Sequence, residues 1–128
     1  AMSLSVWNAN GNETEQAFRD LAAATNNKPW VVLSSGMDKK SFYKCLELAY
    51  KNGASGYLAG RTIWLDAFKS YPDTQQVENG LNEDSVNYVK KLNELTADNA
   101  KSLETFFNNG FKINSPEKLS SNFGGFLW

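Results

Sequence analysis

The most informative absence in this sequence is histidine, which occurs nowhere among its 128 residues. Histidine is the commonest general base and the commonest metal ligand, so a self-contained zinc enzyme or serine–histidine hydrolase is excluded. Cysteine occurs once, as Cys45, which excludes an internal disulfide and fits a reducing compartment. Cys45 falls on the apolar face of an expected helix, so we interpret it as a buried, inert thiol. We therefore expect no metal and no cofactor.

Excess positive charge and long apolar runs are also absent. The sequence has 13 basic and 14 acidic residues and a net charge of −1, with no basic run. This balance argues against nucleic acid as a main partner. No stretch approaches the roughly 18 consecutive apolar residues of a membrane span, and no secretory signal pattern opens the sequence. We therefore expect a cytoplasmic protein with no membrane partner.

The length of the chain limits its architecture. A chain of 128 residues can bury a core, and no linker divides it, so we expect one domain over residues 1–128. It is too short for a complete (β/α)8 barrel, which takes roughly 250 residues.

The clearest pattern is a strand–helix–strand unit in the middle of the chain. Trp30–Leu33 and Ser55–Ala59 are short apolar runs typical of strands. Between them Asp38–Asn52 predicts a helix, with Asp38 as its cap and apolar residues spaced by three and four. Gly53 follows as the residue that ends the helix. Two strands joined by a helix of this length are expected to be parallel, with a right-handed crossover.

Helical periodicity extends on both sides of this unit. It predicts a helix over Glu13–Ala24, a short helix after Arg61 and a long helix over Asp84–Asn108. The polar stretch Thr74–Asn82 is interpreted as a mobile loop. Closer to the C-terminus, Gly110 is expected to end the long helix and residues 115–117 to start another.

Only two strands are expected, so both edges of this parallel sheet are left unpaired. Either a second copy of the chain supplies the missing strands, or the helices fold around the pair in a new way. We expect the first arrangement, a homo-oligomer.

Small polar residues follow both expected strands. Ser34, Ser35 and Gly36 come after the first strand, and Gly60 and Arg61 come after the second. In parallel α/β proteins, ligands bind at the C-terminal ends of the strands. Glycine lets backbone N–H groups approach an anion, serine adds a hydroxyl donor, and arginine offers a planar fork. Singly, these features fit a tight turn and a surface charge; together they predict a phosphate site.

These same residues carry a resemblance to a known family. The segments PWVVLSSGMD and GASGYLAGRTIW resemble the last two strand–helix units of class I tagatose 1,6-bisphosphate aldolases. They resemble the sulfofructose-phosphate aldolases more closely still, through Leu-Ser-Ser-Gly, Gly-Ala-Ser-Gly and Ala-Gly-Arg. The resemblance covers about Lys28–Trp64 and continues weakly through residues 110–112.

The resemblance implies an α/β fold that is the C-terminal portion of a (β/α)8 (TIM) barrel. It also implies a sugar-phosphate or dihydroxyacetone phosphate ligand, whose phosphate is gripped by Ser34, Ser35, Gly36, Gly60 and Arg61. In that family the Schiff-base lysine lies on the sixth strand and a catalytic glutamate lies earlier, so both would precede Ala1. We therefore expect a phosphate-binding part without catalytic residues, inactive by itself. Two alternatives stay open: a non-enzymatic half-barrel oligomer, and an unrelated adaptor that uses its long helix.

Overall fold

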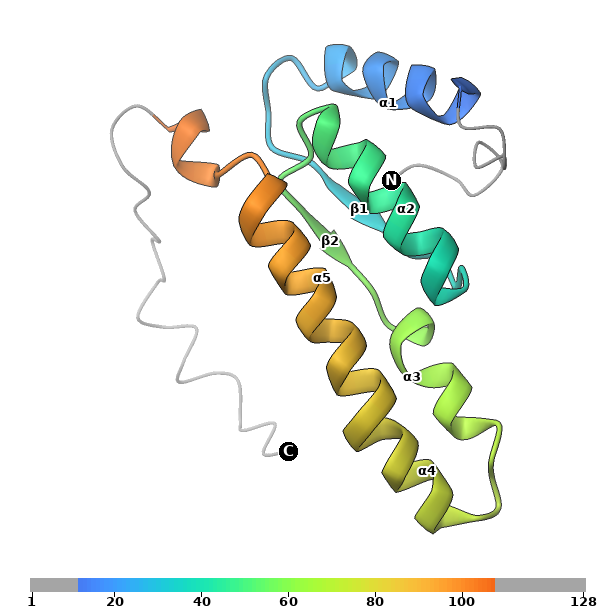
Figure 1. Ribbon diagram of the computed structural model, residues 1–128. Coiled ribbons are helices and arrows are strands. Elements are labelled where there is room, and N and C mark those ends of the chain that lie inside the picture. Colours follow the sequence, from blue (N-terminus) through green and yellow to red (C-terminus); the bar gives the residue numbers. More distant parts are fainter. Residues whose placement is uncertain (1–11, 108–128) are drawn as a thin grey trace, which may run out of the picture.

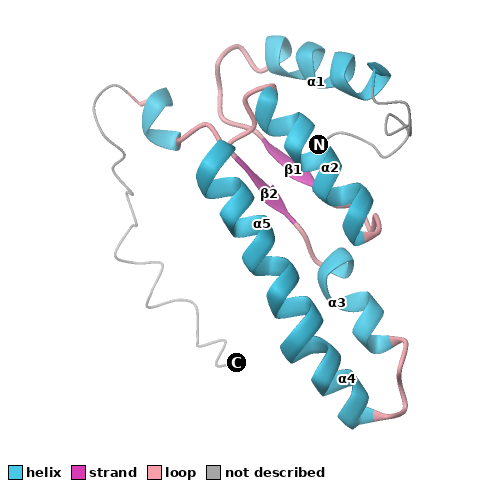
Figure 2. Ribbon diagram, viewed as in Figure 1, coloured by secondary structure: helices cyan, strands magenta, loops and turns pink. Residues whose placement is uncertain are grey.

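The computed structural model describes residues 12–107, which form an α/β arrangement around a small sheet (Figures 1 and 2). Within this part of the chain, no helix has both the length and the apolar character needed to cross a bilayer. The elements in chain order are α1 (Asn12–Ala24), β1 (Val31–Leu33), α2 (Lys39–Lys51), β2 (Gly56–Leu58), α3 (Arg61–Phe68), α4 (Thr74–Gly80), the π-helix η2 (Leu81–Ser85), α5 (Val86–Asn99) and the 3-10 helix η3 (Leu103–Phe106).

The two strands pair in parallel, which confirms the expected strand–helix–strand unit. Both strands are shorter than predicted, because the regular ladder covers three residues of each. One further hydrogen bond extends the pairing at each end, from Ser34 N–H to Leu58 C=O at 2.9 Å and from Ser55 N–H to Trp30 C=O at 2.8 Å. The register pairs Val31 with Gly56, Val32 with Tyr57 and Leu33 with Leu58.

Helices α2 and α5 cover one face of this sheet. Val32 and its partner Tyr57 point to that face, where Val32 is 6% exposed. The Tyr57 ring meets Phe42 of α2 edge-on at 6.1 Å, and its hydroxyl donates to Asn93 of α5 at 2.8 Å. These two contacts explain why α2 and α5 lie side by side above the strands (Figure 1).

The opposite face of the sheet is apolar and uncovered by any described element. Strand alternation places Val31 and Leu58 there, and they remain 44% and 58% exposed. Both outer edges of the two-stranded sheet are also unpaired within residues 12–107. The expected open sheet is therefore present in this part of the chain.

Helix α2 forms the centre of the core, as its periodicity predicts. The Ser41 backbone N–H donates to Asp38 Oδ1 at 2.9 Å, so Asp38 is the expected cap. Gly53 follows with φ of +87°, a value that suits glycine. Cys45 is 2% exposed, and burial raises the pKa of its thiol to about 11, in agreement with an inert buried cysteine. The buried face of α2 comprises Phe42, Cys45, Leu46, Ala49 and Tyr50.

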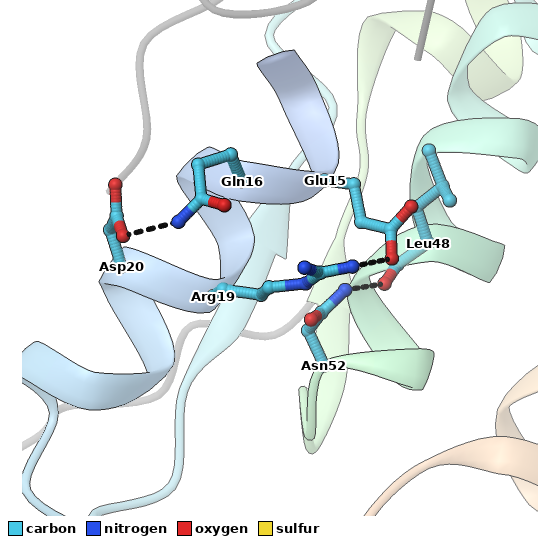
Figure 3. A network of polar contacts seen from close by, with 6 residues as sticks. All are labelled: Glu15, Gln16, Arg19, Asp20, Leu48 and Asn52. Carbon is cyan, nitrogen blue, oxygen red and sulfur yellow. Dashed lines mark hydrogen bonds and ion pairs between the residues drawn. The ribbon is translucent and has the colours of Figure 1, made fainter. Parts of the chain in front are cut away.

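Helix α1 packs on the core through one aromatic contact. Phe18 is fully buried and stacks on Trp30 with ring centroids 5.9 Å apart. Figure 3 shows three polar contacts near this helix that are local in sequence: Arg19 to Glu15 at 2.6 Å, Gln16 to Asp20 at 2.8 Å and, at the C-cap of α2, Asn52 to the Leu48 carbonyl at 2.8 Å. Exposed pairs of this kind contribute little, so the buried residues Thr14 and Phe18 hold α1 against the core.

The prediction of a mobile loop over Thr74–Asn82 is wrong, because this stretch is helical. Asp73 caps α4 by accepting the Gln76 backbone N–H at 3.0 Å. Only Val77 of α4 is buried, so the helix has no apolar stripe that a pattern search can find. Gly80 allows α4 to lie close to α3, since an added Cβ there would be 3.1 Å from the Ala67 Cβ.

The prediction of one helix over Asp84–Asn108 is wrong at both of its ends. Helical structure already begins in α4 and passes through η2 into α5. It stops at Asn99, because Ala100 is extended and the Lys101 N–H donates to the Ala54 carbonyl at 3.0 Å. The expected helix stop at Gly110 and the helix start at residues 115–117 lie outside the described residues.

Candidate functional site: an anion pocket at the strand ends

The loops after β1 and β2 line one common cavity of about 460 Å³. It lies at the C-terminal ends of both strands, where the sequence places the phosphate site. All five predicted residues belong to its lining: Ser34, Ser35, Gly36, Gly60 and Arg61, together with Leu33, Leu58, Ala59 and Trp64. The two loops are therefore brought together as expected.

The first loop is a tight left-handed turn. Ser35 and Gly36 have φ values of +48° and +81°, and the Met37 N–H closes the turn onto the Ser34 carbonyl at 2.9 Å. Within residues 12–107, the N–H groups of Ser35 and Gly36 donate no hydrogen bond to the protein. Successive free N–H groups in a turn form a concavity that suits an anion. Ser34 differs from its neighbours because it is only 4% exposed.

Arg61 reaches across to this turn from the start of α3. A Cβ added at Gly36 would lie 3.5 Å from both Cζ and Nη2 of Arg61, so the guanidinium lies directly beside the turn. Glycine keeps this approach open. The two ion pairs found in the described part of the chain join Arg19 to Glu15 and Lys69 to Asp66. Arg61 has no carboxylate partner among these residues, so its charge is available to a bound anion.

The N-terminus of α3 adds positive potential to the same cavity. Gly60 occupies the N-cap position and provides no side-chain hydrogen bond to the helix. The N-terminus of α2 differs, because Asp38 caps it. Hydrogen bonds from Ser41 hold the pKa of Asp38 below its usual value, so this cap is anionic at neutral pH. Of these two termini, only that of α3 has a dipole free of a capping carboxylate.

A buried threonine ties the two loops together, and sequence reasoning missed it. Thr62 is 5% exposed, and its hydroxyl donates to the Met37 carbonyl at 2.7 Å. This bond joins the first turn of α3 to the end of the left-handed turn. The only sequence signal for this bond is the hydroxyl residue that directly follows Gly60-Arg61. That signal does not identify its partner, which lies 25 residues away in the chain.

A smaller cavity of about 150 Å³ also contacts Gly36 and Arg61. It contains the exposed pair of Asp66 and Lys69, whose charged atoms are 2.6 Å apart. Lys69 lowers the pKa of Asp66, chiefly through this hydrogen bond. The pairing satisfies Asp66 locally, so it does not compete for Arg61.

Both loops lie in a segment that is similar to a known protein family. Residues 5–66 match the family model described as DeoC/LacD family aldolase. The matched range contains both loops of the cavity and ends within α3. Over these residues, the chain is similar to the DeoC/LacD aldolase family. The resemblance to tagatose 1,6-bisphosphate aldolases is thereby confirmed at the level of the family.

Two individual proteins similar to this chain are streptococcal aldolases. The chain is 33% identical over 87 residues to tagatose 1,6-diphosphate aldolase 2 of Streptococcus pyogenes serotype M1, which covers 65% of this chain. It is 38% identical over 61 residues to tagatose 1,6-diphosphate aldolase 2 of Streptococcus mutans serotype c, which covers 46% of this chain. The chain spans 26% of the length of the first relative and 18% of the second.

Proposed function

We propose that this chain is the phosphate-binding part of a class I ketose-phosphate aldolase that releases dihydroxyacetone phosphate. The observation that carries the proposal is the placement of the Ser34–Gly36 turn and Arg61 around one cavity. This cavity lies within the segment that matches the aldolase family. Its ligand is a sugar phosphate or dihydroxyacetone phosphate, bound through the phosphate group.

The cavity supplies three kinds of donor to a phosphate. The free N–H groups of Ser35 and Gly36 act as neutral donors, and the Arg61 guanidinium offers a charge-assisted fork to two oxygens. The N-terminus of α3, which begins after Gly60, adds the positive end of a helix dipole. Trp64 gives one wall a large aromatic surface for the carbon part of the ligand.

We assign no catalytic residue within this chain. By family resemblance, the Schiff-base lysine and the catalytic glutamate belong to strands that precede the matched units. The described lysines occupy turns and exposed or partly exposed helix positions, which do not favour the deprotonated amine that attacks a ketone. The isolated chain is therefore expected to bind phosphate without cleaving a ketose bisphosphate.

The open sheet supports the further proposal that this partial TIM barrel is completed by a second copy. Val31 and Leu58 leave an apolar sheet face exposed, and exposed apolar patches mark association surfaces. We expect a homo-oligomer when light scattering is measured between micromolar and millimolar chain concentrations. A monomeric mass across that range would contradict this part of the proposal and leave the phosphate site untouched.

The phosphate site is tested by titration calorimetry with dihydroxyacetone phosphate. Arg61→Ala removes a charge-assisted pair worth about 1.5–3 kcal/mol, so affinity should fall roughly ten- to a hundredfold. Arg61→Lys should recover part of the loss, since a point charge cannot reproduce the fork. Arg19→Ala is the matched control, because Arg19 is an exposed arginine in α1 whose partner is Glu15. Equal isotherms for Arg61→Ala and wild type would refute the assignment of Arg61.

A non-enzymatic half-barrel oligomer is the second candidate, favoured by the same open sheet face. Borohydride reduction in the presence of dihydroxyacetone phosphate separates it from a complete class I enzyme. A covalent adduct on any lysine would show that the chain performs the Schiff-base step by itself. An adaptor that uses its long helix is less favoured, because Leu92 and Leu95 of α5 are buried in the core.

A further inference from the structure

A second cavity, of about 510 Å³, lies in the groove between α2 and α5. We call it the lysine groove. Its basic lining comes from Lys39, Lys40 and Lys44 of α2 and from Lys91 of α5, and its aromatic lining from Tyr43 and Tyr88. It shares no lining residue with the anion pocket at the strand ends. The lysine groove is therefore a separate surface feature.

The positive charge of the lysine groove is only partly balanced by nearby carboxylates. Within residues 12–107, none of its four ammonium groups forms an ion pair or a hydrogen bond. Glu47 is the single carboxylate in the lining. Asp38 is a second acidic group nearby, since its charge adds to the effect of burial in raising the pKa of Tyr88. A chain with a net charge of −1 thus concentrates four lysines against one lining carboxylate. Such clustering attracts anions to a groove.

The floor of the lysine groove is fixed by contacts between the two helices. The Tyr88 hydroxyl donates to the Lys39 carbonyl at 2.8 Å, and burial is the main cause that raises the pKa of Tyr88. The Lys39 ammonium lies 5.7 Å from the centre of the Tyr88 ring. Below this contact, Leu46 and Leu92 are fully buried in the common core. The lysines of α2 and α5 therefore face a common space that packing holds in place.

We infer that the lysine groove binds a small molecule that carries two or more phosphate groups. Lys40 and Lys44 are four residues apart on α2, so they are neighbours on its surface, and Lys91 faces them from α5. Because these ammonium groups are spread over two helices, they suit a ligand with several anionic groups better than a ligand with a single anionic group. Lysine binds phosphate as a flexible point charge, without the planar fork that arginine offers to carboxylates and phosphates. The volume lies within the range of ligand sites, roughly 300–1,000 Å³.

The test is titration calorimetry of the full chain with inorganic tripolyphosphate. In the variant Lys44→Gln/Lys91→Gln, affinity should fall about tenfold, as expected for two partly screened charges. The matched control, Lys51→Gln/Lys90→Gln, removes two exposed lysines from the same helices outside the groove, and it should stay within about twofold of wild type. Arg61→Ala should also leave tripolyphosphate binding to the groove unchanged.

Orthophosphate serves as the second probe, and the groove variant should change its binding much less than that of tripolyphosphate. Equal losses in the groove variant and in the matched control would overturn the inference, because net charge alone would then explain the binding. Loss confined to Arg61→Ala would also overturn it, since the probe would then occupy the strand-end pocket. Circular dichroism of each variant verifies that the helices are retained.

Discussion

The hydroxyl of Thr62 is the contact on which the geometry of the anion pocket most directly depends. It donates to the Met37 carbonyl at 2.7 Å and thereby joins α3 to the turn that follows β1. Thr62→Val keeps the shape of the side chain and removes the donor. Thr62→Ser keeps the donor and removes a methyl group. The pair of variants therefore separates the hydrogen bond from the packing.

The expected cost of Thr62→Val follows from the burial of this site. Thr62 is 5% exposed, so water cannot readily replace the lost donor at the Met37 carbonyl. An acceptor left without its partner costs about 1–3 kcal/mol of the free energy of unfolding. For a chain of this size, such a loss lowers the melting temperature by about 3–9 °C. Thr62→Ser loses about 0.8 kcal/mol for one buried methyl group, so melting temperature alone does not separate the variants.

Amide hydrogen exchange at the turn gives the decisive measurement. The Met37 N–H is bonded to the Ser34 carbonyl, so its protection reports whether the turn stays closed. Thr62→Val should accelerate exchange of this amide by about tenfold, which corresponds to about 1.4 kcal/mol of local opening. Thr62→Ser should leave it near the wild-type rate. If both variants exchange at the same rate, the hydroxyl does not hold the loops together and the reasoning is wrong.

Two further predictions follow from titratable groups. Because hydrogen bonds lower the pKa of Asp38 in the folded state, its contribution to stability is present above the unfolded pKa of about 3.8 and is lost as the pH falls further. The melting temperature of wild type should therefore fall more between pH 5 and pH 3 than that of Asp38→Asn, which keeps a cap that does not titrate. Cys45, with a pKa of about 11, should react with a thiol reagent at pH 8 at least about a hundredfold more slowly in the folded chain than in urea. A fast reaction in the folded chain would show that the thiol is accessible.

The strand–helix–strand unit could be predicted because its signals are local. Asp38 caps α2 three residues ahead of the N–H that it accepts, and Gly53 takes up positive φ directly after the helix. Apolar spacing within Asp38–Asn52 identifies the buried face without reference to any other element. The cap, the glycine and the apolar spacing all favour the conformation found in the fold, and sequence reasoning succeeds where local signals agree in this way.

The helices after α3 could not be predicted in the same way. Helix α4 buries only Val77, so the cap at Asp73 is its one local signal, and its polar sequence predicts a loop. The end of α5 depends on a hydrogen bond from Lys101 to the Ala54 carbonyl, a partner 47 positions earlier in the chain. Tertiary contacts of this kind override helical periodicity and leave no trace in the local pattern.

The polar features of the molecule also divide into those that a local sequence pattern predicts and those that depend on tertiary packing. Glycine, serine and arginine directly after two strands predict an anion pocket, because the ends of parallel strands meet at one edge of the sheet. The hydrogen bond from Thr62 to Met37 forms only when α3 packs beside α2. In the same way, Lys91 approaches Lys40 and Lys44 only when α5 packs against α2. A pattern search along the chain therefore finds the two loops but not the hydrogen bond that joins them. It does not find the lysine groove either.

The capping of the two helices that begin beside the pocket explains why its ligand should bind against α3. Helices α2 and α3 each start directly after a strand-end loop, so each could direct its dipole at an anion. Asp38 places a carboxylate on the N-terminus of α2, which repels a phosphate there and satisfies the first turn. Gly60 leaves the N-terminus of α3 without such a charge, and Arg61 follows it. Charge and free N–H groups thus converge between Gly36 and Arg61, and we propose this gap as the position of a bound phosphate.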